Sequence, residues 1–101
     1  MENQHRKISG YRELNQSEID LMNEIKALGP VVEGVIIKVQ EHIKSQRDRV
    51  AEDRSMNLIN AVHEHERLEL ATPERFAALA KTDFQTALMY LTRSVAQPTF
   101  F

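Results

Sequence analysis

Apolar residues recur every three or four positions along most of this chain, which is the period of an amphipathic helix. A first helix is predicted over residues 15–28. Asn15 can cap it, and Glu18 lies three residues later, as in a capping box. Gly29 and Pro30 then predict its end, because glycine tolerates a left-handed exit and proline disfavours continuation of the helix.

A second helical region is predicted over residues 30–71, and its apolar stripe changes side partway along. Seven apolar positions share one face at about 100° per residue: Val31, Val32, Val35, Ile36, Val39, Ile43 and Val50. The later ones, Met56, Ile59, Val62 and Leu70, fall on roughly the opposite side. A break near residues 51–55 would remove this conflict. One long helix that contacts different neighbours at its two ends is the alternative.

The last helix is predicted over residues 72–97. Thr72 is a suitable N-cap, Pro73 suits the first helical position, and Glu74 places an acid in the first turn. An apolar tail, residues 98–101, follows it.

The pattern as a whole predicts an all-α fold, a small helical hairpin or bundle of about four helical segments. Residues 1–101 form one helical-hairpin domain, in which residues 1–14 are an N-terminal arm. A domain of this size buries little apolar surface, and oligomerisation is a common remedy. We therefore expect a homo-oligomer.

Composition excludes several classes of function. The 101 residues include 13 basic and 15 acidic side chains, for a net charge of −2, so binding to the DNA backbone is not expected. Cysteine is absent, which fits a cytoplasmic protein. No apolar run reaches the length of a membrane span, so no membrane partner is expected.

Catalytic and metal-binding patterns are also missing. His63 and His65 lie two positions apart, so on a helix they point to different sides and do not readily share a metal ion. The sequence contains no phosphate-binding glycine loop. We predict no catalytic residues, no metal and no cofactor.

Two residues suggest binding to a nucleotide. Lys26 lies within the wide apolar arc of the first helix, where a lysine either extends to water or meets an anion. Tyr11 precedes that helix, and its ring either closes the top of the bundle or gives a base a surface to stack on. Together they would supply a flat surface for a base and a cation for a phosphate.

Residues 5–26, which read HRKISGYRELNQSEIDLMNEIK, resemble the N-terminal signature of the phage anti-CBASS cyclic-oligonucleotide sponges. Residues 82–85 and 93–98 resemble the end of that family, whereas residues 31–70 show no such likeness. The resemblance implies a helical hairpin that assembles as a hexamer. It also implies sequestration of cyclic dinucleotides made by bacterial immune synthases, without any chemistry, in the cytoplasm of an infected host.

The same resemblance implies roles for particular residues. Tyr11 corresponds to the stacking tyrosine of the family and Lys26 to its phosphate-binding lysine, with Gly10 and Arg12 as weaker ligand-binding candidates. Some members also bind cyclic trinucleotides through an arginine at a separate threefold site. Arg75 is the candidate for that role in this chain, and Arg67 and Arg93 are the alternatives.

Symmetry supports an assembly. A cyclic dinucleotide carries two bases and two phosphates, so one tyrosine and one lysine are too few for it, and an isologous dimer doubles both. The alternative function is a helical adaptor or regulatory protein that docks on another protein through the apolar arc and the tail. An enzyme that degrades the messenger is disfavoured, because the chain lacks a catalytic set.

Overall fold

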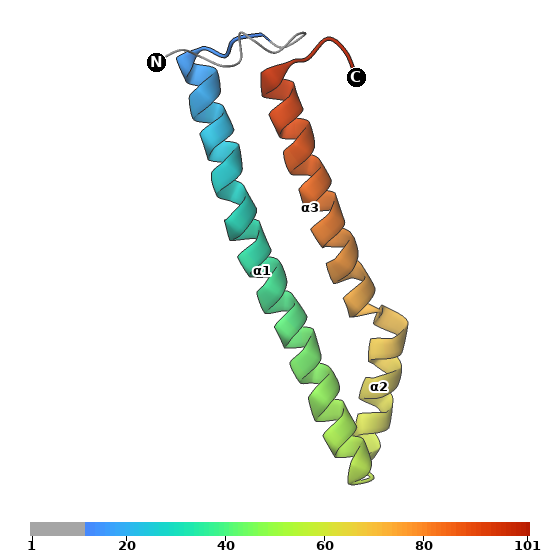
Figure 1. The fold of residues 1–101 in the computed structure, drawn as a ribbon. Coiled ribbons are helices and arrows are strands. Elements are labelled where there is room, and N and C mark those ends of the chain that lie inside the picture. The colour runs from blue at the N-terminus through green and yellow to red at the C-terminus, as the bar shows by residue number, and fades with distance from the viewer. Residues whose placement is uncertain (1–11) are drawn as a thin grey trace. The chain divides into compact units, whose positions relative to one another are not determined.

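The computed structural model describes residues 12–101, which form three consecutive helices (Figure 1). Helix α1 spans Gln16–Ser55, helix α2 spans Ile59–Ala71 and helix α3 spans Pro73–Ala96. No strand occurs among residues 12–101. The all-α prediction is confirmed, with three helices in this range instead of about four segments.

Helix α1 begins with the predicted capping box. The Asn15 Oδ1 accepts a hydrogen bond of 3.0 Å from the backbone N–H of Glu18. In return, the Glu18 carboxylate accepts one of 3.0 Å from the N–H of Asn15. Two backbone donors that have no partner inside the helix are thereby satisfied, which fixes where α1 starts.

The predicted end of the first helix at residue 28 is wrong, because α1 continues through Gly29 and Pro30 to Ser55. Gly29 does not take the left-handed conformation that would have ended the helix; it packs against α3, and a Cβ built on it would lie 3.9 Å from the Leu88 Cδ1. Pro30 lacks an N–H, so one turn of the helix loses a hydrogen bond.

The break expected near residues 51–55 lies slightly later, in the turn formed by Met56, Asn57 and Leu58. Asn57 has a left-handed φ of 58°, which asparagine tolerates better than most residues. The N–H of Leu58 reaches back to the carbonyl of Asp53 over 3.1 Å and closes the turn. The chain thus reverses in three residues. The turn does not bring the later apolar stripe into the core, because Ile59, Val62 and Leu70 are exposed and Ala61 and Leu68 are buried instead.

The junction between α2 and α3 is shorter still. Thr72 adopts a left-handed conformation (φ 45°, ψ 56°), and its N–H donates to the carbonyl of Leu68, which ends α2. Pro73 then starts α3 at the residue where the sequence predicts a restart. At the other end, Gln97 has a φ of 53° and its N–H donates to the carbonyl of Arg93, so α3 ends just before Pro98.

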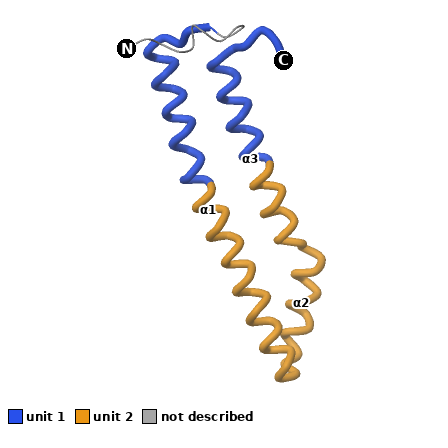
Figure 2. The backbone as a smooth tube through the Cα atoms, in the orientation of Figure 1, with its two compact units in different colours: residues 1–32, 83–101 blue, residues 33–82 orange. Residues whose placement is uncertain are grey.

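The chain divides into two compact units, coloured separately in Figure 2. Unit 1 contains residues up to Val32 together with Asp83–Phe101, so it pairs the first part of α1 with the second part of α3. Unit 2 is Glu33–Thr82 and contains the rest of α1, all of α2 and the start of α3.

Unit 2 holds the most deeply buried side chains of the described residues. Ile36, Ile43 and Val50 recur every seven residues along α1, a spacing that keeps one seam facing its neighbours. The α2 residues Ala61 and Leu68, also seven apart, are buried as well, and Leu68 is only 2% exposed.

An arginine ties the three helices of unit 2 together. Arg47 on α1 donates from Nε and Nη2 to the two carboxylate oxygens of Glu74 on α3, at 2.7 and 3.0 Å. Its Nη1 donates to Glu69 on α2 at 2.8 Å. The guanidinium lowers the pKa of Glu74, chiefly through these hydrogen bonds.

Unit 1 is less completely buried. None of its described residues belongs to the buried core, and several apolar side chains are largely exposed, including Val31 at 65%, Met89 at 70% and Tyr90 at 69%. Isolated exposed apolar residues are ordinary, but this number in a small unit indicates surface that a ligand or a second chain could cover.

Candidate functional site

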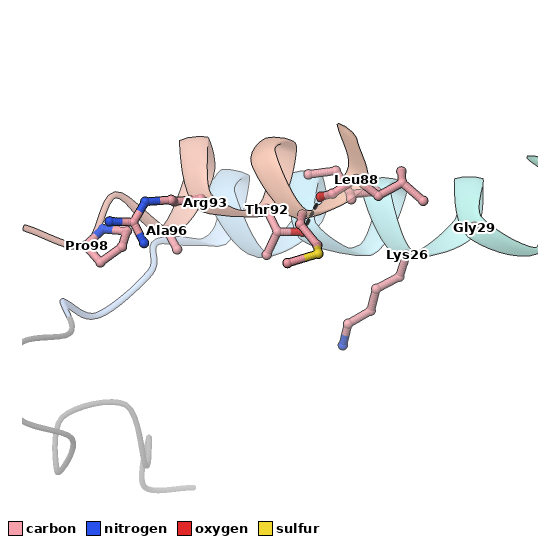
Figure 3. A pocket seen from close by; sticks show the side chains of 9 residues that line it. Lys26, Gly29, Leu88, Thr92, Arg93, Ala96 and Pro98 are labelled. Carbon is pink, nitrogen blue, oxygen red and sulfur yellow. Dashed lines mark hydrogen bonds between the residues drawn. The ribbon is translucent and has the colours of Figure 1, made fainter. Parts of the chain in front are cut away.

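A pocket of about 520 Å³ lies in unit 1, between the first part of α1 and the end of α3 (Figure 3). Its lining is mainly apolar, with two cationic side chains. The lining residues are Ile25, Lys26, Gly29, Leu88, Met89, Thr92, Arg93, Ala96 and Pro98. Gly29 lies where this part of α1 contacts α3, and a Cβ there would be in ordinary van der Waals contact with Leu88.

Lys26 is exposed on α1, at the edge of the pocket. Its side chain extends away from Leu88 in Figure 3. The ammonium group makes no hydrogen bond or ion pair with residues 12–101, so within this range its three donors are available to an anion. The prediction that this lysine either reaches water or meets an anion is therefore consistent with its position.

Arg93 contributes the second cation from α3. Its Nη2 donates to the backbone carbonyl of Phe100 at 3.0 Å, which holds the C-terminal tail against the end of α3. The sequence suggested Arg93 only as an alternative for a separate trinucleotide site. The structure instead brings it to the pocket that Lys26 lines.

The electrostatic character of the pocket follows from these two side chains. None of the lining residues within the described range 12–101 is an aspartate or glutamate, so none of them neutralises either cation. The apolar lining offers surface for flat or apolar groups, and the single lining hydroxyl, on Thr92, is directed to the carbonyl of Leu88 at 2.9 Å. Such a pocket suits an anion that also carries apolar or aromatic surface.

Arg12, a weaker ligand-binding candidate, is engaged in contacts within unit 1. Its Nε donates to the carbonyl of Ala96 at 3.2 Å and its Nη2 to the carbonyl of Val95 at 2.7 Å. Nη1 and Nη2 also bind the carboxylate of Glu18. Four of its five N–H groups thus have partners.

These contacts give Arg12 a structural role. The carbonyls of Val95 and Ala96 lie in the last turn of α3, where no helical donor reaches them. Arg12 supplies donors to them and joins the end of α3 to the capping box of α1. Hydrogen bonding by Arg12 is also the main cause of the lowered pKa of Glu18.

The two other arginines considered for a trinucleotide site lie in unit 2 and do not line the pocket. Arg67 forms an ion pair with Glu64 on the same helix. Arg75 is exposed, and its guanidinium lies over the ring of Phe76 at 5.7 Å from the centroid.

Gly10 and Tyr11 lie outside the residues that the structure describes. Their predicted roles in ligand binding therefore stay predictions.

Two other kinds of site were sought among residues 12–101. No group of three or more histidine, aspartate or glutamate side chains there is placed to hold a metal ion. Within the same range, no helix has the length and apolar character needed to cross a membrane.

The pairing of Lys26 with Arg93 was missed by sequence reasoning. The two residues are far apart in the chain, and only the antiparallel packing of α1 against α3 brings them to one pocket.

Comparison with known proteins identifies the family of the chain. Residues 5–96 match the family described as Acb2/Tad1, hairpin domain. The chain is also 41% identical, over 107 aligned positions, to the Anti-CBASS protein 2 of Pseudomonas phage JBD67, and the alignment covers 97% of each chain. The resemblance seen in the sequence is thereby confirmed, and the chain belongs to the Acb2/Tad1 hairpin-domain family, the family of the anti-CBASS sponges.

Proposed function

We propose that this protein binds cyclic dinucleotide second messengers in the cytoplasm of an infected host and holds them intact. The immune effector that these messengers activate would then stay silent. Membership of the Acb2/Tad1 hairpin-domain family and the similarity to Anti-CBASS protein 2 support a role against CBASS immunity.

The observation that carries the proposal is the pocket of unit 1. A cyclic dinucleotide has two flat bases and two phosphodiesters, each with one negative charge. The pocket offers apolar surface from Ile25, Leu88 and Met89. In the part of the chain that the structure describes, the Lys26 ammonium group has no partner and no carboxylate that would repel the phosphates lines the pocket.

Lys26 and Tyr11 are the proposed contacts. Lys26 would bind a phosphate through charge-assisted hydrogen bonds, and Tyr11 would stack on a base, an interaction worth about 1–3 kcal/mol. A second copy related by a twofold axis would supply the same pair to the other half of the ligand.

The exposed apolar side chains of unit 1, among them Val31, Met89 and Tyr90, favour such self-assembly. A hexamer with twofold axes, as the resemblance would allow, would contain pairs of this kind. Light scattering on the purified protein measures the assembly.

Calorimetry with a panel of cyclic dinucleotides, including cyclic di-AMP and cyclic di-GMP, tests the site. We expect Lys26→Ala and Tyr11→Ala each to weaken binding at least tenfold. Lys38→Ala, at another exposed lysine of α1 that lines none of the pockets described, is the matched control and should bind like the wild type. Absence of binding to the whole panel by folded protein would refute the proposal, and so would equal affinity in all three variants.

Sequestration without hydrolysis needs its own measurement. Ligand incubated with the protein and released by heating should elute from a chromatography column as the intact cyclic compound. Linear dinucleotides in that eluate would indicate a nuclease instead.

The proposal extends to cyclic trinucleotides at a separate site that uses Arg75. The support is that Arg75 is exposed and has no carboxylate partner among residues 12–101, whereas Arg67 is already paired with Glu64. Arg75→Ala should weaken binding of a cyclic triadenylate and leave cyclic dinucleotide binding unchanged. If Arg67→Ala alone has this effect, the site belongs to Arg67.

One observation favours the adaptor function as the second candidate. Ile59, Val62 and Leu70 are exposed on the side of α2 opposite the buried Ala61 and Leu68. An exposed apolar stripe of this kind suits docking on another protein. Capture of a host protein by the wild type, abolished by Ile59→Asp, together with no small molecule in extracts of the purified protein, would favour the adaptor.

A further inference from the structure

Arg93 lies in the pocket of the proposed function, and that function does not yet account for it. It is the pocket's only cationic side chain from α3, whereas Lys26 is the only one from α1. In Figure 3 the two side chains are separated along the pocket, with Arg93 toward Pro98. Two cations placed apart suit a ligand with two separated negative charges better than a single phosphate.

The hydrogen bonds of Arg93 leave most of its donors free. A guanidinium has five N–H groups. One of them, on Nη2, is used by the carbonyl of Phe100, and the Arg93 side chain makes no other hydrogen bond or ion pair with residues 12–101. The remaining four are enough for a bidentate contact with two phosphate oxygens.

Three of the other described arginines differ from Arg93, because carboxylates already pair with them. Arg12 is occupied by Glu18 and two carbonyls, Arg47 by two glutamates, and Arg67 by Glu64. Arg93 instead lines a pocket to which residues 12–101 contribute no carboxylate. Its single bond to a neutral carbonyl positions the guanidinium without neutralising it.

We propose that Arg93 is a second phosphate-binding residue of the pocket and acts with Lys26 on the two phosphodiesters of a cyclic dinucleotide. This inference rests on the proposed function. In a twofold-symmetric pair of chains, each phosphodiester would meet one lysine and one arginine. The pocket would then favour ligands that carry both negative charges over ligands with one.

Affinity for charged and uncharged ligands tests this role. Calorimetry would compare cyclic di-AMP with its methylphosphonate analogue, in which both phosphodiester charges are removed. We expect Arg93→Gln to weaken binding of cyclic di-AMP at least tenfold and to leave the weak binding of the neutral analogue unchanged. Arg93→Lys should recover part of the loss, because it keeps the charge but not the bidentate fork.

Loss of the Arg93 side chain also frees the tail from its carbonyl contact, so this effect needs a matched control. A chain that ends at Thr99 removes the Phe100 acceptor and keeps the arginine. It should bind cyclic di-AMP like the wild type. If it binds as weakly as Arg93→Gln, the arginine acts only by holding the tail, and the inference is overturned.

The remaining outcomes separate this inference from the proposed function. If the wild type binds cyclic di-AMP, Lys26→Ala weakens it and Arg93→Gln does not, the function stands and the role of Arg93 is refuted. An equal loss of affinity for the charged and neutral ligands in Arg93→Gln refutes it as well, because that pattern indicates packing. If the wild type binds no cyclic dinucleotide, both fail together.

Discussion

Leucines at positions 68 and 70 of α2 allow a direct test of where the core lies. Leu68 is 2% exposed and Leu70 is 87% exposed, although they are two residues apart on the same helix. Leu68→Ala removes three buried carbon atoms. At about 0.8 kcal/mol for each, the loss is ~2.4 kcal/mol, and the cavity left behind brings it to about 3 kcal/mol.

The matched variant Leu70→Ala makes the same chemical change at the surface. It loses almost no burial within the chain, so the free energy of unfolding should change by less than about 0.5 kcal/mol. Helix propensity changes equally in both variants, because both replace leucine with alanine inside α2. The difference between them therefore reports burial alone.

Thermal unfolding followed by circular dichroism at 222 nm measures both variants. A loss of about 3 kcal/mol corresponds to a Tm lower by roughly 12–24 °C in a domain of this size. The scans need at least two protein concentrations, because assembly makes Tm depend on concentration. If Leu70→Ala lowers Tm as much as Leu68→Ala at every concentration, the assignment of the core to the Leu68 side of α2 is wrong.

Three further perturbations test other features. Arg47 lowers the pKa of Glu74, so their ion pair stabilises the folded protein at neutral pH, and this stabilisation is lost as the pH falls through the lowered pKa. Tm measured from pH 7 to pH 3 should therefore fall less steeply in Glu74→Gln than in the wild type, and parallel curves would contradict this. Asn15→Ala removes the cap of α1 and should cost about 1 kcal/mol in urea unfolding, whereas Asn23→Ala, at an exposed position inside the helix, should not destabilise the protein. Pro30→Ala should raise the free energy of unfolding, by up to about 3 kcal/mol. A free energy of unfolding below that of the wild type would show that this proline does not disturb the helix.

Local signals predicted the helix ends that depend on local chemistry. The capping box of Asn15 and Glu18 forms as expected, because its hydrogen bonds involve only neighbouring residues. The restart at Pro73 also holds, since its fixed φ suits a first helical turn. Periodicity alone was sufficient to assign the fold as all-α.

Features that depend on tertiary packing were predicted wrongly or not at all. Gly29 and Pro30 normally end a helix, yet contact between α1 and α3 keeps α1 continuous there. Arg12 binds carbonyls more than 80 residues away in the chain. Arg93 lies on α3 but lines a pocket whose other wall is part of α1. No spacing rule within a helix contains that information.

The proline inside α1 has a consequence for how the molecule opens. Without an N–H at position 30, the carbonyl of Lys26 lacks its usual helical donor. The part of α1 that belongs to unit 1 ends at Val32, only two residues further along the chain. Unwinding that starts at Gln16 can therefore stop where this backbone hydrogen bond is missing. Amide hydrogens before Pro30 should then exchange with solvent sooner than those around Ile43.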